Sequence, residues 1–412
     1  MNLDNHFAAI LLSVLLFTAG CSEIRQQPAT DFVITNPAEA GSKYPNLHKD
    51  KSGVIHMSWI LGIEEDISAL RYSSFKNDRW TEVQTVRVAE DFFVNWADFP
   101  SVAGYNGEVI AAHWLKEFES DVLATHVQVG FPGEDNRWRQ SVTPHEDRSM
   151  TEHGFVSMLP LNESKVLAIW LDGRKTEGRA HDEYADVSRG MTLRSAEISS
   201  NGDVNRRNEI DDLVCDCCQT DLIAAEGGAL AVYRNRTENE IRDIAINRYD
   251  LETGSWSEPT IVAEDGWQIN GCPVNGPRIA GTNERVAVTW YTVANDSPRV
   301  QLVRSADGGE SFQEPIFIAD ENTIGRPDLI LREDGSVYVS YIIQADDLGY
   351  VMLRKVNPDG TTEVPLQVGV TSSARSSGFP RLVETDEGVL FAWTQTDPVF
   401  KVRTALVPFD LW

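Results

Sequence analysis

The chain has 412 residues, of which 42% are hydrophobic and 24% charged, a composition typical of a folded globular protein. Asp and Glu number 63 against 36 Lys and Arg, so the formal net charge is −27, and a surface of that sign repels phosphate backbones. No segment after the N-terminus has the run of about 18 apolar residues that a membrane span requires. These properties exclude a nucleic-acid partner, a multispan membrane protein and a coiled coil.

The N-terminus has the pattern of an export signal. Residues 7–17 (FAAILLSVLLF) form an apolar stretch of signal-peptide length, followed by Thr-Ala-Gly and Cys21. This ending resembles the lipobox of bacterial lipoproteins, which implies cleavage after residue 20 and a lipid on Cys21. The resemblance, with serine after the cysteine, implies an outer-membrane lipoprotein whose folded domain lies in the periplasm or at the cell surface. The alternatives are an ordinary cleaved signal peptide and a chance apolar segment.

The rest of the chain is a repeat of short strands. Apolar strands that usually end near an aromatic residue recur about every 50 to 65 residues, each preceded by a strand that opens near a proline. Short alternating strands separated by Gly, Asn and Asp predict antiparallel sheet. The seven apolar strands are 53–60, 109–115, 166–174, 229–234, 285–291, 336–343 and 388–395.

This repeat predicts an all-β fold, a β-propeller of seven four-stranded blades, with six blades as the alternative. We expect residues 21–29 to be a tether and residues 30–412 to be a single propeller domain. The last unit ends after its third strand at 401–407, and residues 30–36 precede the first full unit without a partner there. We therefore expect 30–36 to supply the missing strand and close the ring; a free N-terminal extension is the alternative.

One polar turn carries a family resemblance. Residues 305–312 (SADGGESF) match the pattern S-x-D-x-G-x-x-[FW], which is similar to the Asp-box of sialidase-like (BNR-repeat) propellers. Asp-boxes lie on the face away from the active site, so the match implies the fold rather than the activity. The resemblance suggests Arg278, Arg326 and Arg381 as a carboxylate-binding triad and Tyr291 as a nucleophile. The arginine motif expected near the first blade is absent, however, and YPNL stands there at 44–47.

Propeller geometry predicts where a site lies. Connections that enter first strands and leave second strands share one face, and loops on a rigid scaffold often carry function. After Cys21, the remaining cysteines are Cys215, Cys217, Cys218 and Cys272, and all four fall in such entering connections. We considered three roles for them: a disulfide that joins neighbouring blades, a soft-metal site, and a redox thiol pair. For the metal, Cu or Zn, the candidate ligands are Cys217, Cys218, Cys272 and His153.

Charged and aromatic residues of the same face are candidates for ligand binding or catalysis. Arginine binds carboxylates through two parallel hydrogen bonds, although an ion-pair network that only supports the loops is equally compatible. The candidate ligand-binding residues are Asp98, His113, Arg234, Arg236 and Arg278. The candidate catalytic residues are Asp172, Arg174, Arg234, Arg236 and Tyr291.

Two functions follow from these observations. The first is an exported, lipid-anchored, monomeric propeller that binds a soft metal ion or a small anionic ligand. The second is a glycoside hydrolase of the sialidase type that acts on acidic glycans. The sequence does not decide whether the protein is an enzyme.

Overall fold

The computed structural model describes residues 32–118, 123–133, 137–179, 186–282, 284–320 and 322–412. The predictions for the signal peptide, for Cys21 and for the tether at 21–29 lie outside the described residues. Among the residues that the structure describes, no helix has the length and apolar character needed to cross a membrane. The described helices are short 3-10 turns: η1 (Arg174–Thr176), η2 (Val187–Arg189), η3 (Ala294–Asp296), η4 (Arg375–Ser377) and η5 (Phe409–Leu411).

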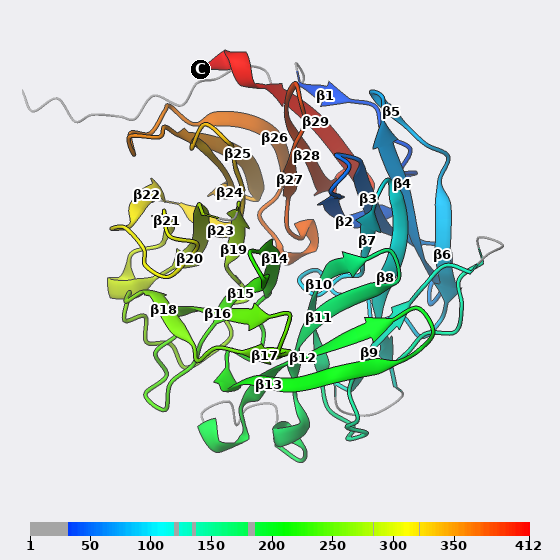
Figure 1. Cartoon of the computed structure of the whole chain (residues 1–412). Helices are drawn as coiled ribbons and strands as arrows, with labels where there is room; N and C mark the ends of the chain where they lie inside the picture. Colours follow the sequence, from blue (N-terminus) through cyan, green and yellow to red (C-terminus); the bar gives the residue numbers. More distant parts are fainter. Residues whose placement is uncertain (1–31, 119–122, 134–136, 180–185, 283, 321) are drawn as a thin grey trace, which may run out of the picture.

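In the described ranges, seven antiparallel sheets surround a central axis (Figure 1), which confirms the predicted seven-bladed propeller. Blade 1 comprises β2 (Ser42–Lys49), β3 (Ile55–Gly62), β4 (Ser68–Lys76), β5 (Arg79–Trp80) and β6 (Gln84–Ala89); blade 2 comprises β7 (Ser101–Tyr105), β8 (Glu108–Glu117) and β9 (Thr125–Gly130). Blade 3 comprises β10 (His153–Asn162), β11 (Lys165–Asp172), β12 (Met191–Ser199) and β13 (Val204–Val214); blade 4 comprises β14 (Asp221–Ala225), β15 (Gly228–Arg234), β16 (Ile244–Asp250), β17 (Ser255–Trp256) and β18 (Thr260–Ala263). Blade 5 comprises β19 (Arg278–Gly281), β20 (Val286–Thr292), β21 (Arg299–Ser305) and β22 (Ile316–Ala319); blade 6 comprises β23 (Thr323–Leu331), β24 (Val337–Ala345), β25 (Leu348–Val356) and β26 (Leu366–Ser372). Blade 7 comprises β27 (Arg381–Glu384), β28 (Gly388–Gln395), β29 (Lys401–Pro408) and the N-terminal β1 (Val33–Ile34).

The outer position of a blade is its most variable part. In blades 1 and 4 two short strands share it, because β5 and β6 both pair with β4, and β17 and β18 both pair with β16. In blade 2, Val129 of β9 forms an isolated bridge with Val142, which takes the outer position. Inner strands contact the inner strands of the neighbouring blades around the whole ring. The blades therefore differ in their outer strands, at the rim of the propeller, whereas the inner strands around the axis are arranged regularly.

The ring is closed as predicted from the unpaired N-terminal segment. Val33 pairs with Ala405 and Ile34 with Thr404, so β1 becomes the fourth strand of blade 7. Figure 1 shows β1, in blue, beside β29, in red. The closure joins the two ends of the domain and removes an unpaired sheet edge.

Aromatic residues of the second strands pack between the blades. Trp59, Trp170 and Trp290 occupy equivalent positions in β3, β11 and β20, and none of them is more than 1% exposed. The described hydrophobic residues form seven clusters, each built mainly from two adjacent blades. The sheets are therefore held face to face by apolar burial, and polar functional groups are confined to the axis and the loops.

Strand pairing fixes two distinct faces. His153 at the start of β10 lies opposite Asp172 at the end of β11, so connections into first strands and out of second strands share one face, called here the loop face. The Asp-box-like turn lies on the other face, between β21 and β22, where the Asp307 carboxylate accepts hydrogen bonds from Ser305 and Ser311. Gly308 and Gly309 have positive φ angles of 71° and 92° there, a conformation that favours glycine.

Candidate functional site

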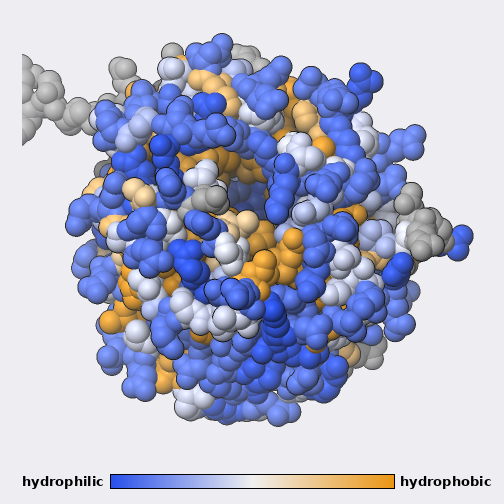
Figure 2. All heavy atoms as spheres, in the orientation of Figure 1, coloured by the Kyte–Doolittle hydropathy of each residue, from blue (hydrophilic) through white to orange (hydrophobic). Residues whose placement is uncertain are grey.

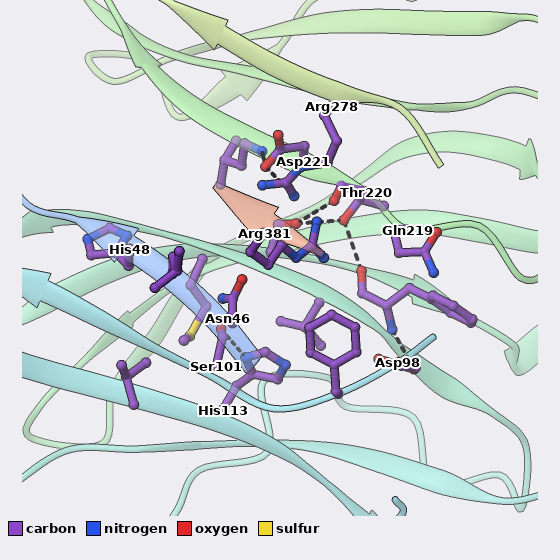
Figure 3. Close-up of a pocket in the computed structure, with 18 of the residues that line it drawn as sticks. Asn46, His48, Asp98, Ser101, His113, Gln219, Thr220, Asp221, Arg278 and Arg381 are labelled. Carbon is purple, nitrogen blue, oxygen red and sulfur yellow. Dashed lines mark hydrogen bonds and ion pairs between the residues drawn. The ribbon is translucent and has the colours of Figure 1, made fainter. Parts of the chain in front are cut away.

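The seven inner strands place one equivalent residue each at the axis. In every blade this residue pairs with the residue that precedes the second-strand aromatic. Six of the seven line a cavity of about 210 Å³ (Figure 3), and Figure 2 shows a largely hydrophilic face that is hollowed near its centre. In blade order, this axial ring is Asn46, Ser101, Ser157, Asp221, Arg278, Asp328 and Arg381.

Three of the seven axial residues, Asp221, Arg278 and Asp328, form an ion-pair network. Arg278 Nη1 lies 3.1 Å from Asp221 Oδ1, and Arg278 Nε lies 3.0 Å from Asp328 Oδ1. The second oxygen of each aspartate accepts a backbone N–H from the next blade, that of Ile279 at 2.9 Å and that of Leu382 at 3.1 Å. These groups join blades 4 to 7 through their inner strands, so Arg278 is held by the fold rather than free to grip a ligand.

Two further ligand-binding candidates lie in the same cavity. Asp98 accepts a hydrogen bond from the backbone N–H of Phe155 at 2.7 Å, and burial raises the pKa of Asp98 to about 7. His113 Nδ1 lies 2.9 Å from Ser101 Oγ, and burial lowers the pKa of His113 to about 3. Asp98, His113 and Arg278 therefore share the axial cavity. The other two ligand-binding candidates, Arg234 and Arg236, do not line it.

The cysteines form a separate cluster on the loop face. Cys215, Cys217 and Cys218 lie in the connection from β13 to β14, and one sulfur from each falls within 4.8 Å of the others. Cys272, in the connection from β18 to β19, interacts with Cys217. The structure describes all four as free thiols, and the 2.9 Å between the sulfurs of Cys215 and Cys218 exceeds a disulfide bond length of about 2.05 Å. We call these four residues the thiol cluster.

The surroundings of the thiol cluster favour one thiolate. Burial raises the pKa of Cys215, but hydrogen bonds from Cys217 and Cys218 and the charges of Arg242 and Arg234 outweigh it, so its pKa is lowered. Burial and the neighbouring Cys215 raise the pKa of Cys217 and of Cys218. Cys215 is therefore the member of the cluster whose surroundings most favour the thiolate.

Arg234 is held entirely by the backbone. Its side chain is 1% exposed and donates to the carbonyl oxygens of Asn275, Arg242 and Tyr291 at 2.6 to 3.2 Å. Its guanidinium also lies 5.0 Å from the Trp267 ring. Among the described residues no carboxylate forms an ion pair with it, and its charge contributes to lowering the pKa of Cys215.

The arginines next to Arg234 have carboxylate partners. Arg236 pairs with Asp216 at 3.2 Å and with Glu240 at 2.5 Å. Glu240 also accepts from Arg242 at 2.7 Å, and Asp216 is 2.8 Å from Arg179. Arg236 is therefore part of an ion-pair network that supports the loops of blades 3 and 4.

His153 lies in another cluster, away from the cysteines with which we grouped it. Its Nε2 is 3.0 Å from Asp147 Oδ2 and 3.7 Å from Asp172 Oδ1, and its Nδ1 contacts the carbonyl oxygen of Thr125 at 3.0 Å. Asp172 is itself held by Arg174, which donates from Nε at 2.7 Å and from Nη2 at 2.8 Å. Asp147, His153 and Asp172 could hold a metal ion, although the oxygens of Asp172 already accept hydrogen bonds from Arg174 and Trp170.

The arrangement that a sialidase resemblance implies is only partly present. Arg278 and Arg381 line the axial cavity, but Arg326 donates to Ser377 Oγ at 2.5 Å and to Gly378 O at 2.9 Å instead. Burial raises the pKa of Tyr291, whose carbonyl oxygen accepts from Arg234. The three arginines therefore do not all reach the cavity.

Several residues of these sites were absent from the predicted set. Cys215 completes the thiol cluster, and Arg242 supplies it with charge. Glu152 has its pKa raised to about 8 by burial and by the carboxylates of Asp98 and Asp216. Aligning the seven repeats would have placed Asn46 in the axial ring; nothing in the local sequence points to Glu152.

Comparisons with known proteins agree on the fold. No family model matches the chain, and no curated protein does. A solved polysaccharide lyase, an ulvan lyase bound to a GlcA–Rha3S ligand, aligns with a TM-score of 0.52 at 9% identity, covering 92% of this chain and 94% of the lyase. A protein of unknown function from Dyadobacter fermentans aligns with a TM-score of 0.49 at 12% identity (92% and 97% covered), and a Trypanosoma rangeli sialidase in complex with sialic acid with 0.46 at 11% (80% and 56% covered). At these identities the chain is similar to propeller proteins in fold.

Proposed function

We propose that this protein is a metal-binding propeller in which the thiol cluster holds one soft metal ion. The observation that carries the proposal is that the sulfurs of Cys215, Cys217 and Cys218 lie within 4.8 Å of one another, while Cys272, from a connection more than 50 residues further on, interacts with Cys217. Cys215 and Cys218 are 1% and 2% exposed, so the sulfurs are shielded from solvent oxidants. Thiolates select soft or borderline ions, chiefly Cu(I) and Zn(II).

The charges around the cluster support metal binding over a structural disulfide. A disulfide is neutral and gains nothing from Arg234 and Arg242, whereas a metal bound by three or four thiolates carries net negative charge. Arg234 has no carboxylate partner among the described residues, and Arg242 Nη1 is buried without a hydrogen bond. Both would compensate such an anion. Four thiolates suit tetrahedral Zn(II); a subset of three suits Cu(I).

Elemental analysis of the purified protein tests this proposal. We expect about one copper or zinc ion per chain, and loss of the ion in Cys217→Ser and Cys272→Ser. Glu238→Gln changes an exposed residue of the neighbouring loop and should retain the metal. Absence of metal together with four oxidised cysteines would refute the proposal in favour of disulfides.

A second candidate function is glycan processing, and the carboxyl groups of Asp98 and Glu152 favour it. Their pKa values of about 7 and about 8 mean that either group can donate a proton near neutral pH, as glycoside cleavage requires. The fold likeness to an ulvan lyase is compatible with this function. Turnover of sialosides or uronic-acid polysaccharides that is lost in Asp98→Asn and Glu152→Gln, with metal content unchanged, would support it.

We also propose that the protein is a monomeric outer-membrane lipoprotein anchored through Cys21, on the basis of the lipobox-like sequence. Replacement of Cys21 by Ala should abolish labelling by a fatty-acid probe and release the protein from the membrane fraction. Unchanged membrane retention without lipid label would contradict the anchor.

A further inference from the structure

The fold holds the His153 side chain in one orientation. The side chain is fully buried, and its Nδ1 lies 3.0 Å from the carbonyl oxygen of Thr125 and 3.1 Å from that of Thr151. The Thr125 hydroxyl donates to the His153 carbonyl oxygen at 3.0 Å and accepts from the His153 N–H at 3.1 Å. The His145 ring is stacked on the His153 ring, with centroids 4.0 Å apart and planes 6° apart. The plane of the His153 imidazole and the direction of its Nε2 are therefore fixed.

The same contacts decide which nitrogen of His153 carries a hydrogen. Carbonyl oxygens only accept hydrogen bonds, so Nδ1 is the donor, and in a neutral imidazole Nε2 then has a lone pair. Nε2 is buried and has no hydrogen-bond partner among the described residues, although Asp147 Oδ2 is 3.0 Å and Asp172 Oδ1 is 3.7 Å away. A nitrogen lone pair thus faces two carboxylate oxygens, and this arrangement requires a cation between them.

A proton on Nε2 is one such cation, but the geometry suits a larger one. At 3.0 Å the Asp147 oxygen is near enough for a hydrogen bond, yet it is not aligned with an Nε2–H. A metal ion about 2.0–2.2 Å from each of its ligands separates neighbouring ligand atoms by about 2.8–3.6 Å. The distances of 3.0 and 3.7 Å from Nε2 are close to that range, and the ligand atoms of Asp147, His153 and Asp172 all lie within 4.8 Å of one another.

The charges around the cluster also favour a cation. Arg174 donates to both oxygens of Asp172, and Arg194 lies 4.0 Å from the same carboxylate. Among the described residues, however, no lysine or arginine forms an ion pair with Asp147, whose one partner of this kind is His153. With His153 neutral, Asp147 is therefore a carboxylate without a counter-charge at contact distance.

We infer that His153 Nε2, Asp147 and Asp172 bind one divalent metal ion, with Mn(II) as the best match, at the loop-face end of blade 3. One imidazole with two carboxylates suits a harder ion than the thiolates of the thiol cluster do. The backbone carbonyls that accept from His153 and the arginine that holds Asp172 are the outer contacts that orient metal ligands. The Asp147 side chain is 17% exposed, so the ion reaches the site from solvent and keeps water in its other positions. The site is separate from the thiol cluster and does not rest on the proposed metal-binding function of that cluster.

Titration of the purified protein with Mn(II) tests the inference, with electron paramagnetic resonance measuring the free ion. We expect one Mn(II) per chain, bound at least about tenfold more weakly by Asp147→Asn and by His153→Gln. Glu146→Gln removes the same charge from the exposed neighbouring residue and should bind like the natural protein. Cys217→Ser should also bind like the natural protein, because thiolates select softer ions than Mn(II). If His153→Gln does not fold, Asp147→Asn, which changes a partly exposed side chain, provides the test.

Two further measurements distinguish a metal ligand from a residue that only supports the fold. Mn(II) should raise the midpoint of thermal unfolding of the natural protein and of Glu146→Gln, but not that of Asp147→Asn. Anomalous diffraction at the manganese absorption edge should show one peak bonded to His153 Nε2 and Asp147. Equal affinities of Asp147→Asn and Glu146→Gln, or a peak elsewhere, would overturn the inference. So would the absence of binding up to about 1 mM Mn(II), the weak limit of extracellular calcium sites, which would leave a proton as the cation on Nε2.

Discussion

Arg234, beside the thiol cluster, and Arg381, in the axial ring, are both buried arginines that form no ion pair with a described carboxylate. They differ in how many of their N–H groups donate hydrogen bonds. Arg234 donates to three carbonyl oxygens, two from connecting segments (Arg242 and Asn275) and one from strand β20 (Tyr291). Arg381 makes no hydrogen bond with any described residue. The comparison shows that burial alone does not tell how firmly an arginine is tied to the fold; the number of occupied donors does.

The largest expected effect distinguishes the two arginines by stability. Arg234→Met leaves the carbonyl oxygens of Asn275, Arg242 and Tyr291 buried without donors, and we expect the free energy of unfolding to fall by about 3–5 kcal/mol. Urea unfolding followed by tryptophan fluorescence measures it, with Arg79→Met as the exposed control. A loss below about 1 kcal/mol would mean that Arg234 does not support the loops.

Asp98 tests whether burial at the axial cavity disfavours a charged carboxylate. Burial raises its pKa in the folded protein to about 7, from the ordinary aspartate value of 3.8, so the folded protein binds this proton more tightly. Its contribution to stability is complete below about pH 4 and is lost as the pH rises to about 7. We expect Asp98→Asn, which keeps an acceptor for the Phe155 N–H, to raise the free energy of unfolding at pH 8 by about 2–4 kcal/mol.

The measurement is urea unfolding at pH 5 and at pH 8, with Asp66→Asn, an exposed aspartate, as the control. In the natural protein the free energy of unfolding should differ between pH 5 and pH 8. The Asp98→Asn variant should lose most of this difference. An unchanged pH dependence would show that Asp98 is not charged in the folded protein at pH 8, or that its proton is not linked to folding.

Arg242 tests the electrostatics of the thiol cluster. It raises the fraction of thiolate at Cys215, so Arg242→Gln should weaken metal binding by about 10–100-fold, as expected for a group that supports the ligands. Competition with a chromophoric chelator measures the affinity. Arg248→Gln, a half-buried arginine on the same blade, should leave it unchanged; equal losses in both variants would point to a general charge effect.

The smallest expected effect completes the comparison. Arg381→Met should change the free energy of unfolding by no more than about 1 kcal/mol, because no hydrogen bond is lost and methionine keeps the contacts with Phe99 and Phe379. Urea unfolding beside Arg234→Met gives the test. A loss as large as that of Arg234→Met would place Arg381 among the structural arginines.

The architecture could be predicted from the sequence, whereas the grouping of residues into sites could be predicted only in part. Strand alternation and second-strand aromatics indicate seven blades, and the unpaired segment at 30–36 indicates closure with 401–407. The positions of Cys217, Cys218 and Cys272 at the starts of neighbouring blades predicted that they meet. His153 also precedes a first strand, but it lies one blade away and interacts with Asp147 and Asp172 instead.

What the sequence by itself determined is therefore periodic: the all-β fold, the number of blades, the closing strand and the face on which each connection emerges. These follow from local patterns, because each blade buries the same apolar positions against its neighbours. Only the tertiary structure decided which charges are paired. Arg278 and Arg381 occupy equivalent positions in their repeats, and they differ because Arg278 has an axial aspartate in both neighbouring blades and pairs with both, whereas Arg381 has Asp328 in one neighbouring blade and Asn46 in the other. Pairing across the axis depends on which blades become neighbours in space, a property that no single repeat contains.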